Sequence, residues 1–476
     1  MKKIIIYSVS LLLALTAATS CNDWLDVDLK TKVKSDDLLT TEAGFKDALV
    51  GVYISMISEQ LYGRELTFGF FEAITGNYDV QMSNTQYYDI TQGNISTTAI
   101  RSRIDAMWLG LYKTVANINN ILDNIDDKRP VFTGDNYEII KGEALALRAF
   151  LHLAVFRIFG DARDLSLPAV PYVTTLGTTI FPALTGKDVL QAVMDDLDAA
   201  LLLLKSDPIY KNRSKVNTAD AFLHNRQMRM NYYAAMAVYA EAAMWAGDKT
   251  KALKYATDVI AVCDELFPWV DRGTVSTSVE TARDRTFSTE HIFCLNVFNL
   301  RALYNTWHSP TTAYLQNVLY KGSWNFETWY QSMRDTDIRF TYLSQFSNTI
   351  WGYHSLKFMQ PDGYRPEYAA RIPLIRRSMM YYIAAECSGN IETATNYLNQ
   401  VRRNRGIAAD LSGLTETSFA TELQREYIKE FWCEGQLFFY MKRRNETANP
   451  LDRWLPFQLR DRYVIAMPEA EIDYGL

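Results

Sequence analysis

Two stretches of this chain repeat one pattern of small and aromatic residues, 142 positions apart. Residues 239–259 form the first copy and residues 381–401 the second. The matching positions are Tyr239 and Tyr381, Ala242 and Ala384, Ala243 and Ala385, Gly247 and Gly389, Ala252 and Ala394, Tyr255 and Tyr397, and Val259 and Val401. Each copy predicts a helix, a glycine-containing turn and a second helix, in which alanines allow close approach and tyrosines fill the grooves. Two such hairpins in one register predict a scaffold of repeated helix pairs.

Four further segments carry apolar residues at the spacing of a helix. They are residues 41–58, 104–125, 137–159 and 187–204. In the second segment Met107, Trp108, Leu111, Val115, Ile118 and Leu122 recur on one face. A proline-rich loop at 168–171 is expected after the third segment. We therefore predict an all-α-dominated fold built on a tetratricopeptide-like helical-repeat scaffold.

Residues 266–365, between the two copies, have a different composition. They are rich in Tyr, Trp and Phe, are broken by Gly, Asn, Ser and Thr, and show no sustained helical period. A shorter aromatic and polar loop spans residues 77–92. Long loops inside an ordered domain are usually functional. We expect helical scaffold at 41–265 and 366–476, with an aromatic loop-rich excursion at 266–365.

The N-terminus has the pattern of a secretory signal. Lys2 and Lys3 precede an apolar run, which is followed by small residues and then Cys21. The run is shorter than the roughly 20 residues that a membrane-spanning helix needs. A break at a cysteine predicts a lipoprotein, with residues 1–20 removed, lipid on Cys21, and residues 21–40 as a tether. A plain secreted protein is the alternative.

Charge and cysteine content exclude some classes of protein. The formal net charge is −6, so a nucleic-acid partner is not expected. Apart from Cys21, the cysteines are Cys263, Cys294, Cys387 and Cys433, which lie far apart and form no C-x-x-C motif. We interpret them as buried free thiols; a disulfide framework or a metal site is the alternative.

Catalytic and cofactor motifs are not found. The five histidines form no H-E-x-x-H pair, and there is no G-x-S-x-G, P-loop or G-x-G-x-x-G motif. Carboxylates are plentiful, so spacing alone leaves a glycosidase pair open. The basic runs 402–405 and 442–444 are interpreted as helix-end charges on a solvated face, with a phosphate site as the alternative. We predict no enzyme activity, no cofactor and no metal.

Several short motifs, in order along the chain, resemble the SusD/RagB family of Bacteroidetes surface lipoproteins. They are Cys21-Asn22-Asp23-Trp24-Leu25-Asp26, residues 45–53, Glu143-Ala144 with Leu147-Arg148-Ala149-Phe150 and Phe159-Gly160, Leu398-Asn399 through Gly406, Glu426 with Glu430, Glu434-Gly435 and Arg443, and Met467-Pro468 with Glu471. The chain departs from the family at Leu437 and Tyr440, where Arg and Asp are usual. The resemblance covers nearly the whole mature chain, so residues 41–476 are predicted to form one SusD-like domain on a divergent branch.

This resemblance implies a non-catalytic binding protein of the outer membrane. It would face the cell exterior on its lipid anchor and act as a lid on a SusC-like TonB-dependent barrel. The tetratricopeptide-like face would hold the barrel, and the aromatic loops would hold an oligosaccharide. A peptide-capturing or purely assembly-type repeat lipoprotein is the alternative, and a helical glycoside hydrolase is a third hypothesis.

The candidate ligand-binding residues come from the two aromatic segments. We predict stacking of sugar faces on aromatic rings, and hydrogen bonds from the polar residues that fix orientation. The candidates are Asn77, Tyr78, Asp79, Tyr87, Tyr88, Trp307, Trp324 and Trp329.

Replacing Cys21 by alanine tests the lipid assignment. Because Cys21 is the residue predicted to carry the lipid, Cys21→Ala should release the protein into the soluble periplasmic fraction. Fractionation of cells followed by immunoblotting measures this. A variant that still fractionates with the outer membrane would show that the assignment is wrong.

Overall fold

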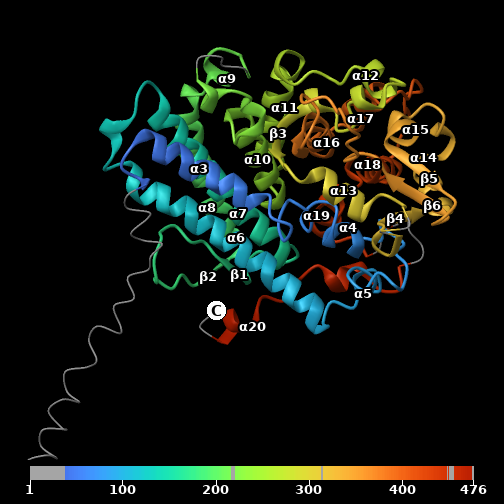
Figure 1. Cartoon of the computed structure of the whole chain (residues 1–476), viewed down its shortest axis with the longest axis horizontal. Coiled ribbons are helices and arrows are strands. Elements are labelled where there is room, and N and C mark those ends of the chain that lie inside the picture. Colours follow the sequence, from blue (N-terminus) through green and yellow to red (C-terminus); the bar gives the residue numbers. More distant parts are fainter. Residues whose placement is uncertain are drawn as a thin grey trace, which may run out of the picture.

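The computed structural model describes residues 38–215, 220–311, 313, 315–447, 449 and 455–473. The predicted signal segment and Cys21 lie outside these residues. Figure 1 shows helices over most of the molecule, with short strands between them. In the described part of the chain, no helix is both long enough and apolar enough to cross a membrane.

The first half of the scaffold is a row of four packed helices. They are α3 (Glu42–Met56), α6 (Thr98–Ile125), α7 (Asn136–Phe159) and α8 (Gly186–Leu203). Each packs on the next, and Figure 1 shows them side by side. The side chain of Thr41 accepts a hydrogen bond from the Gly44 backbone N–H and so caps α3. All four predicted helices are confirmed, with α6 beginning six residues before the predicted start.

The repeated sequence forms two helical hairpins. The first consists of α10 (Tyr232–Trp245) and α11 (Lys249–Leu266), and the second of α16 (Arg377–Cys387) and α17 (Ile391–Asn404). Gly247 turns the first hairpin with φ of 76°, a conformation that favours glycine. The hairpins meet where α11 packs on α16. The predicted helix pairs are confirmed.

The repeated alanines and tyrosines have the predicted roles. Ala242 and Ala384 are completely buried. The ring of Tyr239 stacks on Tyr255 at 4.0 Å in the first hairpin. The equivalent rings of Tyr381 and Tyr397 meet edge to face at 6.2 Å. The register of the repeat is therefore kept, while the ring geometry differs between the copies.

Residues 266–365 leave the helical scaffold but contain short regular elements. Strand β3 (His291–Asn296) pairs antiparallel with β7 (Arg371–Arg376). The repeat predicts a helix pair over residues 371–405, but the first six of these residues are this strand. A second sheet has the order β4 (Tyr320–Gly322), β6 (Gly352–Ser355), β5 (Ser344–Ser347). The helices of this region are α12 (Arg272–Ser276), α13 (Leu300–Trp307), α14 (Ser323–Tyr330) and α15 (Ile338–Leu343). None exceeds eight residues, which is too short for a sequence period to be recognised.

The remaining elements are short, apart from one C-terminal helix. They are α4 (Phe70–Ile74), α5 (Tyr88–Thr91), α9 (Pro208–Lys211), α18 (Glu416–Phe431), α19 (Gln436–Arg444) and α20 (Glu469–Asp473). The expected proline-rich loop at 168–171 is in fact strand β1 (Pro168–Pro171), paired with β2 (Ala183–Thr185). Proline tolerates this edge position because a two-stranded sheet leaves one side of each strand unpaired.

A buried network of charges joins the scaffold to the inserted region. Glu430 on α18 accepts hydrogen bonds from Arg405 Nε at 2.9 Å and Nη2 at 2.6 Å, from Arg339 Nη1 at 2.9 Å, and from Arg376. Arg405 also pairs with Glu290 at 2.6 Å. Burial alone would raise the pKa of Glu430, but the surrounding arginines hold it well below its usual value. The carboxylate is therefore ionised inside the protein.

This network corrects the interpretation of the basic runs. Arg402, Arg405 and Lys442 are buried, not solvated. Lys442 donates to the carbonyl of Ile158, and Arg443 forms an ion pair with Glu386 at 2.6 Å. Only Arg403 has the exposed position expected of a helix-end charge, with about half of its side chain accessible (51%).

Glu72 ties loop 77–92 to the C-terminal helices. Its Oε2 accepts from Asn77 Nδ2 at 2.9 Å, and its Oε1 accepts from the Gly435 backbone N–H at 2.8 Å. Burial raises the pKa of Glu72 to about 7, against the lowering effect of these hydrogen bonds and of Lys357. Asn77 Oδ1 is buried and has no partner, so it can accept from a protonated Glu72 if the amide turns over.

Replacing Glu430 by glutamine should destabilise the fold strongly. The change keeps the volume but leaves three buried arginines without their shared charge, so the free energy of unfolding should fall by roughly 3–5 kcal/mol. Urea denaturation measures this. The exposed Glu392→Gln on α17 is the control and should change the free energy by less than about 0.5 kcal/mol. Equal effects of the two changes would contradict the network's role.

Glu72 should make stability depend on pH. Its raised pKa means that the folded state binds a proton more tightly than the unfolded chain, so this contribution is complete below pH 4.5 and is lost as pH rises to about 7. Glu72→Gln stays neutral, and should therefore gain stability relative to the wild type between pH 4.5 and 8, by at most about 3 kcal/mol. Thermal denaturation across this range measures the difference. The exposed Glu416→Gln should track the wild type, and a constant offset for Glu72→Gln would contradict the assignment.

Candidate functional site

The two aromatic segments singled out in the sequence meet in the structure. The backbone N–H of Asp79 donates to the carbonyl of Tyr320 at 2.7 Å. The carboxylate of Asp79 accepts from Lys321 Nζ at 2.8 Å and from the Gly322 backbone N–H at 2.9 Å. Asn84 Nδ2 donates to the carbonyl of Asn317 at 3.2 Å. Loop 77–92 is thus fastened to strand β4 and to the turn that precedes it.

Most of the predicted ligand-binding side chains are packed inside the protein, at or near this junction. Five of the eight are buried: Asn77, Tyr78, Tyr87, Trp307 and Trp329. Tyr87 and Trp307 pack edge to face at 5.3 Å, Tyr78 donates its hydroxyl to the carbonyl of Phe68, and Trp329 contacts Phe326 and Trp432. The four rings and the Asn77 amide are covered by protein, so burial removes these five from the candidate set. Interior packing explains them better than ligand contact.

The other three predicted residues have accessible side chains. Trp324 is 79% exposed, Asp79 exposes 43% of its side chain, and Tyr88 is half-buried. Trp324 follows strand β4 in the first turn of α14. Asp79 lies beside the same strand, because it bonds Lys321 and Gly322.

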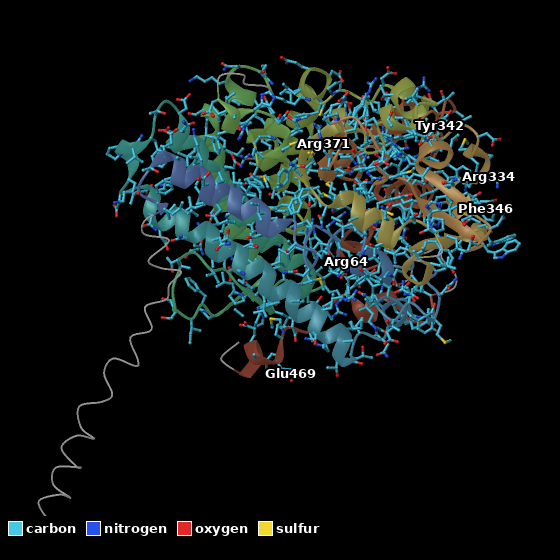
Figure 2. All side chains as sticks on the ribbon, in the orientation of Figure 1. Arg64, Arg334, Tyr342, Phe346, Arg371 and Glu469 are labelled. Carbon is cyan, nitrogen blue, oxygen red and sulfur yellow. The ribbon has the colours of Figure 1, made fainter. Side chains whose placement is uncertain are left out.

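Two exposed aromatic residues of the same sheet were missed by the sequence analysis. Trp351, in the turn between β5 and β6, is 74% exposed, and Phe346 on β5 is 38% exposed. Gly322 pairs with Gly352 across the sheet, and the Ser323 N–H lies 3.5 Å from the Trp351 carbonyl. The two tryptophans therefore flank one end of the sheet. We call Trp324, Phe346 and Trp351 the aromatic platform; Figure 2 shows Phe346 at the edge of the molecule.

The backbone at Trp351 is strained. Its φ is 50°, in the left-handed region that bulky residues rarely adopt. Such strain is kept where the surrounding structure or the function requires it. The sequence feature that could have pointed to Trp351 is the adjoining Gly352. A glycine is required there, because its position next to the Lys321 backbone leaves no space for a side chain.

A polar cleft of about 360 Å³ adjoins the platform and shares Phe346 with it. Its walls include Arg301, Tyr304, Asn305, Gln345, His354 and Gln360. Arg301 is paired with Asp362. Burial lowers the pKa of His354 to about 4, so this histidine is uncharged at neutral pH. The cleft therefore offers hydrogen-bonding groups with a balanced charge, which suits an uncharged polar ligand.

A larger cavity of about 670 Å³ lies elsewhere, between α3, residues 221–229 and β3. Its walls are mostly apolar, with contributions from Val50, Ile54, Met228 and Leu295. Phe298, at its rim, is 77% exposed. We favour the platform and its cleft over this cavity as the functional site, because a hydroxyl-rich ligand needs both ring faces and hydrogen-bonding groups.

Metal and thiol chemistry receive no support from the described residues. Within them, no three His, Cys, Asp or Glu side chains gather in a way that could hold a metal ion. Cys263, Cys294, Cys387 and Cys433 are free and buried, which confirms the interpretation as interior thiols.

Two family models match different parts of the chain. One, described as starch-binding associating with outer membrane, matches residues 23–226. The other, described as the SusD family, matches residues 303–456. The chain is also 22% identical over 193 residues to SusD-like protein P25 of Formosa agariphila. That stretch covers 39% of this chain and 36% of the relative, so the match spans about a third of the relative's length.

Solved structures share the fold over most of the chain. A SusD superfamily protein from Bacteroides thetaiotaomicron has a TM-score of 0.68 at 20% identity, covering 91% of this chain and 98% of that one. A SusD-like carbohydrate binding protein from Bacteroides vulgatus has a TM-score of 0.63 at 18% identity, covering 86% and 84%. The two family models and the common helical fold agree, and the chain belongs to the SusD/RagB family.

Proposed function

We propose that this protein captures oligosaccharide on the aromatic platform and acts as a lid for a SusC-like TonB-dependent transporter. Membership of the SusD/RagB family supports a non-catalytic, glycan-binding role in nutrient uptake. The observation that carries the finer proposal is the exposure of Trp324 and Trp351 at one end of the β4-β6-β5 sheet, next to a polar cleft.

Exposing the rings of Trp324 and Trp351 to water is unfavourable, and a ligand that covers them would remove this cost. Aromatic side chains bury large apolar areas in folded proteins, and clustered exposed apolar groups mark interaction sites. A pyranose presents a C–H face that can cover an indole ring and hydroxyls that need partners. The platform supplies the rings, and Asp79, Asn305, Gln345 and Gln360 supply hydrogen-bonding groups around it.

Packed aromatic rings hold Phe346 of the platform in place. Tyr353, opposite Phe346 on the neighbouring strand, stacks on Phe326 of α14 at 4.7 Å and meets Phe346 edge to face at 5.4 Å. Phe326 also contacts Trp432 at 4.7 Å. A site fixed by such packing loses little conformational entropy when a ligand binds.

The protein would reach its partner through the lipid on Cys21, facing the cell exterior. The row α3, α6, α7 and α8 gives the scaffold a broad helical face, built from a part of the chain that precedes the platform and the inserted region. We propose that this helical face contacts the barrel while the platform faces the incoming ligand. Peptide capture, or assembly without a soluble ligand, remains the alternative function.

Removing one platform ring should weaken glycan binding. Trp324→Ala and Trp351→Ala should each cost roughly 1–3 kcal/mol, by analogy with base–aromatic stacking, which corresponds to about 5- to 150-fold in Kd. A glycan array identifies a ligand, and calorimetry then measures the affinities. Phe298→Ala is the matched control, because Phe298 is equally exposed but lies at the apolar cavity. Unchanged affinity in both tryptophan variants would place the site elsewhere.

The protein should copurify with an outer-membrane barrel. Stable partnerships of this kind typically bury more than about 2,000 Å², so the complex should survive mild detergent. Pull-down from native membranes, followed by mass spectrometry, measures this, with the Cys21→Ala protein as the unanchored control. Recovery of the anchored protein alone, or release of reducing sugar from its ligand, would contradict the proposal.

A further inference from the structure

The mostly apolar cavity beside α3 has exposed hydrophobic side chains in its wall. Val50 and Ile54 lie one turn apart on α3, Phe298 follows β3, and all three are exposed. They line one cavity of about 670 Å³ between these two elements, both labelled in Figure 1. Clustered exposed apolar groups mark interaction sites, and small-molecule sites have volumes of about 300–1,000 Å³. The cavity therefore has the size and the apolar walls of a small-molecule site.

One arginine, Arg229, is part of the cavity wall. Its side chain is 16% exposed, and its Nη1 lies 4.0 Å from Oε1 of Glu143, too far for a hydrogen bond. In the described part of the chain no other group accepts a hydrogen bond from the Arg229 guanidinium. The accessible part of this side chain therefore has unused donors at the wall of the cavity.

The neighbouring Arg226 has carboxylate partners that Arg229 lacks. Arg226 Nη2 donates to Asp207 at 2.7 Å and to Oε2 of Glu143 at 3.1 Å. The other oxygen of Glu143 accepts from the Tyr53 hydroxyl. Both oxygens of Glu143 are thus already bonded, and its charge is shared by the two arginines. The cluster is balanced in charge, but the hydrogen-bonding capacity of Arg229 is left over.

Two aromatic rings hold Arg229 in place. Its Cζ lies 5.0 Å from the ring centre of Tyr53 and 5.0 Å from that of Phe222. A planar guanidinium packed over aromatic faces keeps its donors in a fixed direction. The position of Arg229 is therefore set without an acceptor from the protein, and a ligand oxygen can bond to it without rearrangement of the site.

We propose that this cavity binds a small apolar molecule that ends in a carboxylate or carbonyl oxygen. The apolar body lies against Val50, Ile54 and Phe298, and the oxygen accepts from Arg229. A sugar suits the site less well, because most of its walls offer no partner to hydroxyl groups. The cavity and the polar cleft share no lining residue, so this site does not depend on the proposed glycan binding.

Calorimetry with three simple probes tests the two parts of the site. Octanoate carries the apolar body and a carboxylate, octanamide carries the body and a carbonyl oxygen, and acetate is the charged head alone. The Cys21→Ala protein, used without detergent, should bind octanoate or octanamide and should bind acetate far more weakly. Tighter binding of octanoate assigns the site to a carboxylate, and binding of octanamide that is as tight or tighter assigns it to a carbonyl oxygen. Binding of neither, or of acetate as tightly as octanoate, would overturn the proposal.

Variants in the same background test the named contacts. Arg229→Met keeps the length of the side chain and removes its donors, so the affinity for the tighter probe should fall roughly tenfold or more, as expected for one hydrogen bond to a charged group. Phe298→Ala should weaken both eight-carbon probes alike. The exposed Arg403→Met is the matched control and should bind like the parent. Equal affinity of the parent and Arg229→Met, or an equal loss in the platform variant Trp324→Ala, would show that the probe binds elsewhere.

A second measurement applies if octanoate binds but Arg229→Met does not fold. Carbon NMR of octanoate labelled at its carboxyl carbon follows the pKa of the bound carboxylate. A hydrogen bond from Arg229 favours the ionised form and lowers this pKa relative to free octanoate, whereas burial in a purely apolar site raises it. A raised or unchanged pKa would contradict the proposed contact.

Discussion

The buried carboxylate of Glu430 is the constraint on which the arrangement of this molecule depends. Arginines from α15, from β7 and from the end of α17 converge on it. Burying an arginine without carboxylate partners is costly, so sharing Glu430 couples the burial of the three segments. A helical repeat by itself needs contacts between neighbouring repeats alone. The shared charge adds a long-range condition, which fixes how the inserted region sits on the scaffold.

The buried charges around Glu430 also fix the position of the aromatic platform. Arg339 lies on α15, the helix that leads directly into β5 and carries Phe340, which packs against Tyr353 and Phe326. Lys357, just after β6, donates to Glu434 and to the backbone carbonyls of Glu430 and Trp432. The sheet is thus held at one end, where β5 begins and β6 ends, by charges that reach the C-terminal helices. Glu72 makes a similar connection between loop 77–92 and Gly435.

The scaffold could be predicted because its signals are local. Long amphipathic helices show their period directly, and the repeat shows itself when Tyr239 is aligned with Tyr381. The site could be predicted only in part. The sequence indicated that loop 77–92 and the inserted region would meet, but composition cannot distinguish Trp329, which is buried, from Trp324, which is exposed five residues earlier. From the sequence alone, Arg405 is interpreted as a helix-end charge. In the folded protein it forms ion pairs with Glu290 and Glu430. Trp351 was passed over because only the pairing of Gly322 with Gly352 places it beside Trp324.

The placement of the two tryptophans outside the strands, Trp351 in a turn and Trp324 at the start of α14, has a consequence for how such a protein can diversify. Trp324 and Trp351 sit at the open end of the sheet, outside the strands and away from the charged cluster that anchors it. Turns tolerate changes of sequence and length far better than the elements that they connect. On the proposed function, selection can therefore exchange the ring of Trp351, and with it the ligand that is recognised, while every residue that holds the sheet in place stays the same.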